Sequence, residues 1–216
     1  MDSRRLGTAL LAGALVATSS PPAVLVSGSA IGFYGDRGDE VLTEASAPGT
    51  GFLAEVAQAW EGATSAAEAA GVRVAHVRTG IVLDRRQGAL AKLLPLFRVG
   101  LGGRMGSGRQ WMSWISLADE VEVLCFLLTH DVRGPVDAVA PNPVTNAGLA
   151  KALGRALHRP ALVPVPAFGP RLLLGREMAD ELLFASQRVR PAVLEDAGFA
   201  FHHPDLDGAL TAVMAV

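Results

Sequence analysis

The stretch that decides the fold is AVLVSGSAIGFYG, from Ala23 to Gly35. Its first part, Ala23 to Ser27, is a short apolar run typical of a strand buried on both faces, as in a parallel sheet covered by helices. An elbow of small residues follows and holds the single tyrosine, Tyr34. Ligands of open α/β sheets bind just past the carboxyl ends of such strands. We therefore expect a ligand site near Ser29, Tyr34 and the acidic turn that follows them.

The segment before this strand permits two interpretations. Arg4 and Arg5 precede an apolar stretch with small residues, which is the outline of a secretory or twin-arginine signal. Alternatively, Ser3 caps a helix, and four leucines line its inner face: Leu6, Leu10, Leu11 and Leu15. We favour the helix and hence a cytoplasmic protein, with export as the alternative. A doubly buried strand needs neighbours on both sides, so the sequence also predicts a sheet that lacks its first strands.

Composition restricts the function classes. The chain has 216 residues, half of them hydrophobic, and a formal net charge of -2, which indicates a globular protein without a preference for nucleic acid. The single cysteine, Cys125, lies in the apolar run VEVLCFLL and is expected to be buried. No disulfide or metal site is expected, and no run is long enough to span a membrane.

Strand and helix patterns alternate along the rest of the chain. We expect strands over Val72 to Leu83 and Pro135 to Ala140, and helices over Thr50 to Ala70, Leu117 to Thr129 and Val144 to Leu157. The pattern predicts an α/β fold, a Rossmann-like doubly wound parallel sheet that is truncated at its N-terminus. This domain would span residues 1–158, and residues 159–216 would form a small α-rich C-terminal subdomain.

Two side-chain patterns within these elements also lead to predictions. In the helix from Thr50, the spacing predicts a buried stripe that includes Phe52, Val56 and Trp60 and leaves three glutamates mostly to solvent: Glu55, Glu61 and Glu68. His76 lies inside the second strand, where a hydrogen-bonded core histidine is expected.

The loop VGLGGRMGSGRQWMSW, residues 99–114, is dense in glycine. Its spacing partly fits a nucleotide-binding loop, but a helix precedes it, whereas a phosphate-binding loop is delivered by a strand onto a helix N-terminus. The glycines fit turns or a close approach of backbone to ligand. The candidate substrate-binding residues here are Gly103, Arg109, Gln110 and Trp114, with core packing as the alternative for the tryptophans.

Several motifs together resemble one known family. SGSAIGFYGDRGDEVLTE, GFLAEVAQAWE, VRTGIVL, GLGGRMGSGRQWMSWISLADE and LEDAGFAFHHPDL follow one another as in the atypical extended short-chain dehydrogenases/reductases that are sugar-nucleotide epimerase-like and end in a helical domain of the DUF1731 type. The resemblance implies a Rossmann fold that binds NAD or NADP. Members begin with a strand and a glycine-rich nucleotide loop, which this sequence lacks. The superfamily's tyrosine-lysine pair is also absent, because Gly38 stands four residues after Tyr34.

The resemblance also implies roles for individual residues. Ser29 and Tyr34 would be catalytic, and Asp119 would join the substrate-binding residues. The cofactor-binding residues would be Ser27, Ala30, Arg78 and Gly80. Other roles compete with these: Ser29 could satisfy local backbone, Arg78 could pair with Glu44 or Asp36, and Asp119 could cap the helix from Leu117.

Two functional hypotheses result. The first is an NAD(P)-dependent protein of the epimerase/dehydratase or reductase type that acts on an unknown small molecule, nucleotide sugars included. The second is a truncated, cofactor-free fragment or a non-catalytic binding module of the same family. A small-molecule substrate is the expected partner, and a homodimer is compatible with the sequence.

Overall fold

The computed structural model describes residues 2–166, 168, 172 and 175–215. In chain order its elements are α1 (Asp2–Val16), β1 (Val24–Ala30), the 3-10 helix η1 (Ile31–Tyr34), β2 (Val41–Leu42), α2 (Phe52–Gly62), α3 (Ser65–Ala69), β3 (Arg73–Thr79), β4 (Ile81–Leu83), α4 (Gly88–Arg98), β5 (Trp111–Met112), β6 (Trp114–Ser116), α5 (Leu117–Thr129), β7 (Gly134–Ala138), β8 (Val144–Thr145), α6 (Asn146–Leu157), α8 (Arg176–Ala179), the π-helix η2 (Asp180–Phe184), β9 (Arg188–Val189), α9 (Ala192–Asp196) and α10 (Leu206–Ala215).

The central sheet is parallel, as predicted, with strand order β1-β3-β7. Its register places Ser29 beside Arg78, and Arg78 beside Asp137, so these three residues form one row across the carboxyl end of the sheet. Among the described residues, β1 pairs with β3 alone and forms an edge of this sheet. Facing side chains within such a row lie within interaction distance, which sets up the polar network described below.

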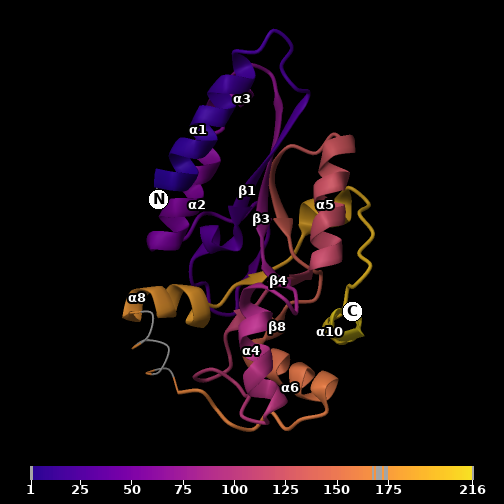
Figure 1. Ribbon diagram of the computed structural model, residues 1–216. Coiled ribbons are helices and arrows are strands. Elements are labelled where there is room, and N and C mark those ends of the chain that lie inside the picture. The colour runs from indigo at the N-terminus through magenta and orange to yellow at the C-terminus, as the bar shows by residue number, and fades with distance from the viewer. Residues whose placement is uncertain (1, 167, 169–171, 173–174, 216) are drawn as a thin grey trace.

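Helices cover both faces of the sheet (Figure 1), with α1, α2 and α3 on one side and α5 on the other. Leu25 and Val74 pack with α1 and α3, whereas their neighbours Val26 and Ala75 belong to the cluster that α5 completes through Val123 and Leu127. Successive residues of a strand point to opposite faces, so each strand supplies both cores. The sheet is therefore doubly covered, as the apolar run in β1 predicts.

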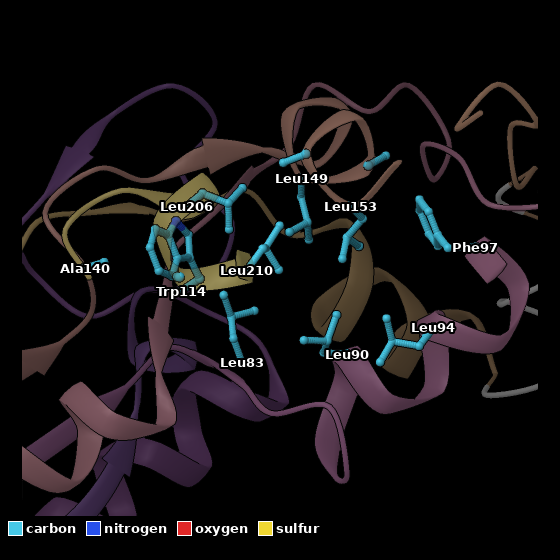
Figure 2. Close-up of a cluster of buried hydrophobic side chains, with 13 residues drawn as sticks. Leu83, Leu90, Leu94, Phe97, Trp114, Ala140, Leu149, Leu153, Leu206 and Leu210 are labelled. Atoms are coloured by element: carbon cyan, nitrogen blue, oxygen red, sulfur yellow. The ribbon is translucent and has the colours of Figure 1, made fainter. Parts of the chain in front are cut away.

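A further core lies beyond the end of the sheet (Figure 2). It joins Leu83 and Trp114 to α4, α6 and α10, and its largest remaining members are Leu90, Leu94, Phe97, Leu149, Leu153, Leu206 and Leu210. In addition, β9 pairs with β2 in parallel. The described residues after 158 thus pack into cores that earlier residues begin, and the predicted boundary at residue 158 stays a prediction. Of the predicted tail, residues 167, 169–171, 173–174 and 216 lie outside the described residues.

Two predicted elements are divided in the structure. The strand expected over Val72 to Leu83 forms β3 and β4, which belong to different sheets. Gly80 lies at the division, where a Cβ atom would come within 2.8 Å of the Ser113 carbonyl oxygen and 2.7 Å of Val139. The segments that hold Ser113 and Val139 thus leave no room for a side chain at the point where the chain passes from one sheet to the next. The helix expected through Ala70 breaks after Gly62, which gives α2 and α3.

The first helix forms, but three of the four leucines predicted to line its inner face are exposed, and only Leu15 among them is half-buried. Leu6, Leu10 and Leu11 are 46%, 75% and 52% exposed, whereas Ala12 is buried. The helix instead packs through its smaller side chains: Ala12 joins the α3 cluster and Thr8 accepts a hydrogen bond from the Trp60 indole. Cys125 was also predicted to be buried and is exposed, because α5 turns Val123 and Leu127 toward the sheet.

No helix in the described ranges combines the length and the apolarity that spanning a bilayer requires.

Asp119 ties the C-terminal segment to α5. Its carboxylate accepts hydrogen bonds from the backbone amides of His202 and His203 and from the hydroxyl of Ser116, which is the N-cap of α5. Replacing Asp119 with Ala leaves two amides without their acceptor, so we expect a loss of about 2 to 4 kcal/mol in the free energy of unfolding. Urea denaturation measures it. Asp131→Ala, at an exposed pair with Arg133, is the control and should cost under about 1 kcal/mol; equal losses would contradict the anchoring role.

Candidate functional site

A cavity of about 580 Å³ opens at the carboxyl ends of β1 and β3. Ser29, Ala30, Thr79 and Gly80 form its strand side. The other walls come from α2, from the segment around β5 and from residues 178–187, including Phe52, Val56, Trp60, Trp111, Met112, Ser113, Met178, Glu181, Leu182, Leu183 and Gln187. The cavity therefore lies at the sheet edge where the sequence places a ligand site.

Arg78 lies next to this cavity, where it is linked through Glu61 to the lining residue Ser29; we call this part of the structure the cavity floor. The residue is 3% exposed, and its Nε and Nη2 donate to the two carboxylate oxygens of Glu61 at 2.8 and 2.9 Å. Glu61 Oε1 also accepts a 2.7 Å hydrogen bond from the Ser29 hydroxyl. The Arg78 guanidinium carbon lies 3.5 Å from the centroid of the Phe33 ring. A bidentate, charge-assisted pair with an aromatic cover fixes the guanidinium in one position.

The same guanidinium continues the network to Tyr34. Arg78 Nη1 donates to the Tyr34 hydroxyl at 2.9 Å, and that hydroxyl donates to the Asp137 carboxylate, whose oxygens lie 2.9 and 2.8 Å away. Both Tyr34 and Asp137 are fully buried. Tyr34 does not line the cavity, so the structure places this predicted catalytic hydroxyl in a position where it orients Arg78 and Asp137.

Burial, neighbouring charges and hydrogen bonds shift the pKa values of the acidic groups in this network. Burial raises the pKa of Tyr34, and the charge of Asp137 adds to that rise. The pKa of Asp137 is raised well above its ordinary value by burial and by nearby Glu44, and burial also raises the pKa of Glu44. Burial would raise the pKa of Glu61 too, but the hydrogen bonds from Arg78 and Ser29 outweigh it and lower the pKa.

The network contains one cation and three carboxyl groups, which explains why the pKa of Glu61 is lowered while those of Asp137 and Glu44 are raised. Arg78 is the cation bound by the network, and its charge is matched by Glu61. Among the described residues neither Asp137 nor Glu44 forms an ion pair, and Glu44 Oε1 accepts hydrogen bonds from the backbone amides of Asp137 and Val193. The second oxygen of Glu44, Oε2, is buried without a hydrogen-bond partner in the described structure. Burial therefore favours the protonated form of both carboxyl groups, and the charge of Glu44 adds to this effect at Asp137.

The N-terminus of α2 opens toward the cavity and carries a carboxylate. Glu181 accepts hydrogen bonds from the backbone amides of Phe52 at 2.9 Å and Leu53 at 2.7 Å. Gly51, with φ of +105°, allows this approach, since a Cβ atom there would lie 2.7 Å from Glu181 Oε1. The first free amides of a helix attract negative charge, and here the chain's own side chain supplies it.

The predicted residues divide between the cavity and the core. Ser29, Ala30 and Gly80 line the cavity, and Arg78 lies directly beneath it in the network with Ser29. Ser27 is buried within the sheet and does not line the cavity. The predicted alternative for Arg78, an ion pair, is confirmed, but its partner is Glu61 and neither Glu44 nor Asp36.

The predicted substrate-binding residues lie away from the cavity. Gly103 packs against the backbone of Val163, and Gln110 is buried with its amide donating to the carbonyls of Met105 and Leu183. Trp114 belongs to the core of Figure 2, where its indole donates to the Asn142 carbonyl. Asp119 anchors the C-terminal segment, and Arg109 is exposed outside the cavity lining. The position of Trp114 favours the packing alternative, whereas the N-cap of α5 is Ser116 and not Asp119 as the alternative for that residue predicts.

Sequence reasoning missed three contributors. Glu61 was expected in solvent, but its side chain is 12% exposed because Arg78 draws it inward. Glu181 reaches α2 from almost 130 residues away, and no local pattern marks it. Glu120 accepts from the Thr79 hydroxyl at 2.8 Å, and burial raises its pKa. His76, by contrast, is the predicted core histidine, bonded to Thr64 at 2.8 Å.

Fold and site together define a Rossmann-like α/β protein with a ligand cavity at the strand ends. Comparison with known proteins specifies the class. Residues 165–213 match the model of a domain of unknown function, DUF1731. Epimerase family protein ML0860 of Mycobacterium leprae is 46% identical over 97% of this chain and 68% of its own length. The chain therefore belongs to the epimerase family.

Solved structures agree with this assignment. Human epimerase family protein SDR39U1 (isoform 2), solved with NADPH, superimposes with a TM-score of 0.92 at 32% identity, over 99% of this chain and 72% of that one. UDP-N-acetylglucosamine 4-epimerase from Bacillus cereus gives a TM-score of 0.78 at 12% identity, over 100% of this chain and 71% of that one, and shows the shared fold alone. The Rossmann-like short-chain dehydrogenase/reductase fold implied by the motifs is thus confirmed.

Removing the Arg78 charge should destabilise the protein strongly. Arg78→Met leaves Glu61 buried without its cation, so we expect a loss of about 3 to 5 kcal/mol in the free energy of unfolding. Arg78→Lys keeps the charge without the bidentate fork and should lose less. Chemical denaturation measures both. The control is Arg155→Met, which breaks an exposed pair with Asp207 and should cost at most about 1 kcal/mol. If Arg78→Met matched this control, the network would not support the fold.

The raised pKa of Glu44 should appear in the pH dependence of stability. A carboxyl group whose pKa is raised on folding stabilises the folded state below its unfolded pKa, and that contribution is lost as the pH rises through the folded pKa. The free energy of unfolding of the wild type should therefore fall as the pH rises above about 4.5, the ordinary range for Glu. In Glu44→Gln the same rise in pH should cause a smaller fall. Denaturation midpoints across pH 4 to 8 test this. Glu40→Gln, at an exposed pair with Arg37, should retain the wild-type slope, and an unchanged slope in Glu44→Gln would refute the raised pKa of Glu44.

Proposed function

We propose that the chain forms the nicotinamide and substrate side of an NADP(H)- or NAD(H)-dependent site of the epimerase or reductase type. The cavity at the carboxyl ends of β1 and β3 carries this proposal, because dinucleotides bind at that edge of open α/β sheets. A relative with a TM-score of 0.92 was solved with NADPH, which supports the same cofactor class here.

The residues present fit one end of such a cofactor. Ala30, Ile31, Thr79 and Gly80 would hold the nicotinamide, which when bound supplies a hydride donor or acceptor. In the described residues no strand leads through a glycine-rich turn into a helix N-terminus; β1, for example, leads into η1. The pyrophosphate and adenosine would have to bind outside these residues.

Ser29 is the polar group best placed to contact a reacting substrate oxygen. It lines the cavity, and its hydroxyl is held by Glu61 at 2.7 Å. Because Glu61 is locked to Arg78, the position of the Ser29 oxygen is fixed by the whole network. Phe52, which the spacing places in a buried stripe, is instead 41% exposed and lies on the cavity wall, where it offers no hydroxyl group. Ser29 would therefore orient the substrate, and Arg78 and Tyr34 would position Ser29.

Nicotinamide binding to the purified chain tests the proposal. Energy transfer from Trp60 and Trp111, which line the cavity, to reduced nicotinamide reports on binding. We expect reduced nicotinamide mononucleotide and NADPH to bind within about threefold of each other, since the pyrophosphate gains no amide cradle. Ala30→Phe, which fills the cavity, should abolish the signal, and exposed Ala17→Phe should not.

Two results would contradict the proposal. Absence of saturable binding by either compound at millimolar concentration would favour the cofactor-free fragment or binding module. Binding that Ala30→Phe leaves intact would place the nicotinamide elsewhere in the chain.

A further inference from the structure

We propose that the cavity takes an uncharged, largely apolar carbonyl compound with a planar ring system, and that it excludes anionic substrates such as nucleotide sugars. This inference rests on the proposed function, which makes the cavity the substrate site. Three observations carry it: the side chains of the walls, the charges beside them, and the carboxylate at the N-terminus of α2.

Most of the lining away from the strand ends is apolar or aromatic. Trp60 comes from α2, Trp111 from β5, and Met178 and Leu182 from the segment that closes the opposite side. Flat aromatic and flexible thioether side chains accommodate planar rings through stacking and dispersion contacts. The polar groups, Ser29, Thr79, Ser113 and Gln187, are few and lie at separate points. Such a lining orients a carbonyl oxygen rather than solvating a polyhydroxylated sugar.

The charges do not provide for a diphosphate. Within the described residues, the charged side chains that line the cavity are Arg4 and Glu181. The Arg4 guanidinium stacks on Trp60, 5.0 Å from its ring centroid, and Arg78 beneath the floor is fully engaged by Glu61 and Tyr34. Proteins bind diphosphates through several Arg or Lys side chains or through free helix amides. Among the described lining residues Arg4 is thus the one cation, and its charge is balanced by the acidic Glu181 in the same lining.

The N-terminus of α2 is the other group at the cavity that could bind an anion, and Glu181 already occupies it. Both of its oxygens accept hydrogen bonds from the first amides of α2, those of Phe52 and Leu53. A substrate phosphate or carboxylate would have to displace this carboxylate or bind beside it against like charge. The α2 terminus therefore acts against anions, and selection between substrates would depend on Glu181.

Two compounds with the same ring system test the charge selection. We expect 2-acetylnaphthalene to quench tryptophan fluorescence saturably, with 2-naphthoate at least about tenfold weaker, and no saturable binding of UDP-glucose at millimolar concentration. Glu181→Gln keeps an acceptor for the α2 amides and should reduce the tenfold difference to about threefold or less. Glu177→Gln, at a residue outside the cavity lining, is the control and should preserve the difference.

A second pair of variants locates the binding. Leu182→Gln alters a cavity residue that is 57% exposed, and Leu128→Gln alters a 55% exposed residue of α5 outside the cavity lining. Leu182→Gln should weaken 2-acetylnaphthalene at least about fivefold, and Leu128→Gln should leave it unchanged. Equal effects of the two variants, equal affinity for the two naphthyl compounds, or tighter binding of UDP-glucose would each overturn the inference. These binding experiments contain no nicotinamide cofactor. A failure of nicotinamide binding is therefore a separate result, which concerns the proposed function alone.

Discussion

The buried ion pair between Arg78 and Glu61 is the interaction on which the site depends. A guanidinium that is 3% exposed is tolerated only with its hydrogen bonds satisfied. Glu61 supplies two acceptors and Tyr34 a third, so three separate elements, β3, α2 and η1, are fixed against one another. Ser29 and Asp137 occupy the same row of the sheet and complete the network on either side. The cavity floor is rigid for this reason.

This network also explains why the superfamily's usual pair of tyrosine and lysine is not needed to organise the site. In that pair the lysine charge lowers the pKa of the phenol. Here Tyr34 is adjacent to a cation, but burial and Asp137 raise its pKa instead. The tyrosine therefore stays protonated and serves as a structural donor. Of the hydrogen-bonded network around Arg78, Ser29 is the member that lines the cavity.

Local patterns predict the framework well, because each signal lies within one element. The apolar run before Ser27 predicts β1, and the pattern over Leu117 to Thr129 predicts α5 with the observed ends, although the helix is capped by Ser116 rather than by Asp119. The cavity position follows from the strand's carboxyl end. Helical periodicity, however, tells which residues share a face and not which face is covered, so it places Leu10 inside and Glu61 outside, and both predictions are wrong. Glu181 meets α2 only through the tertiary fold, so no spacing in the sequence can show it.

The family assignment and the cavity point to one central claim: the space above the Arg78 row is where nicotinamide and substrate meet. A crystal structure of this chain with reduced nicotinamide mononucleotide tests that claim most directly. The account predicts the nicotinamide ring against Ala30 and Gly80, with the Arg78 and Glu61 pair unchanged beneath it. A ring bound at the glycine-dense loop of residues 100–108, or on the surface outside the strand ends, would contradict it.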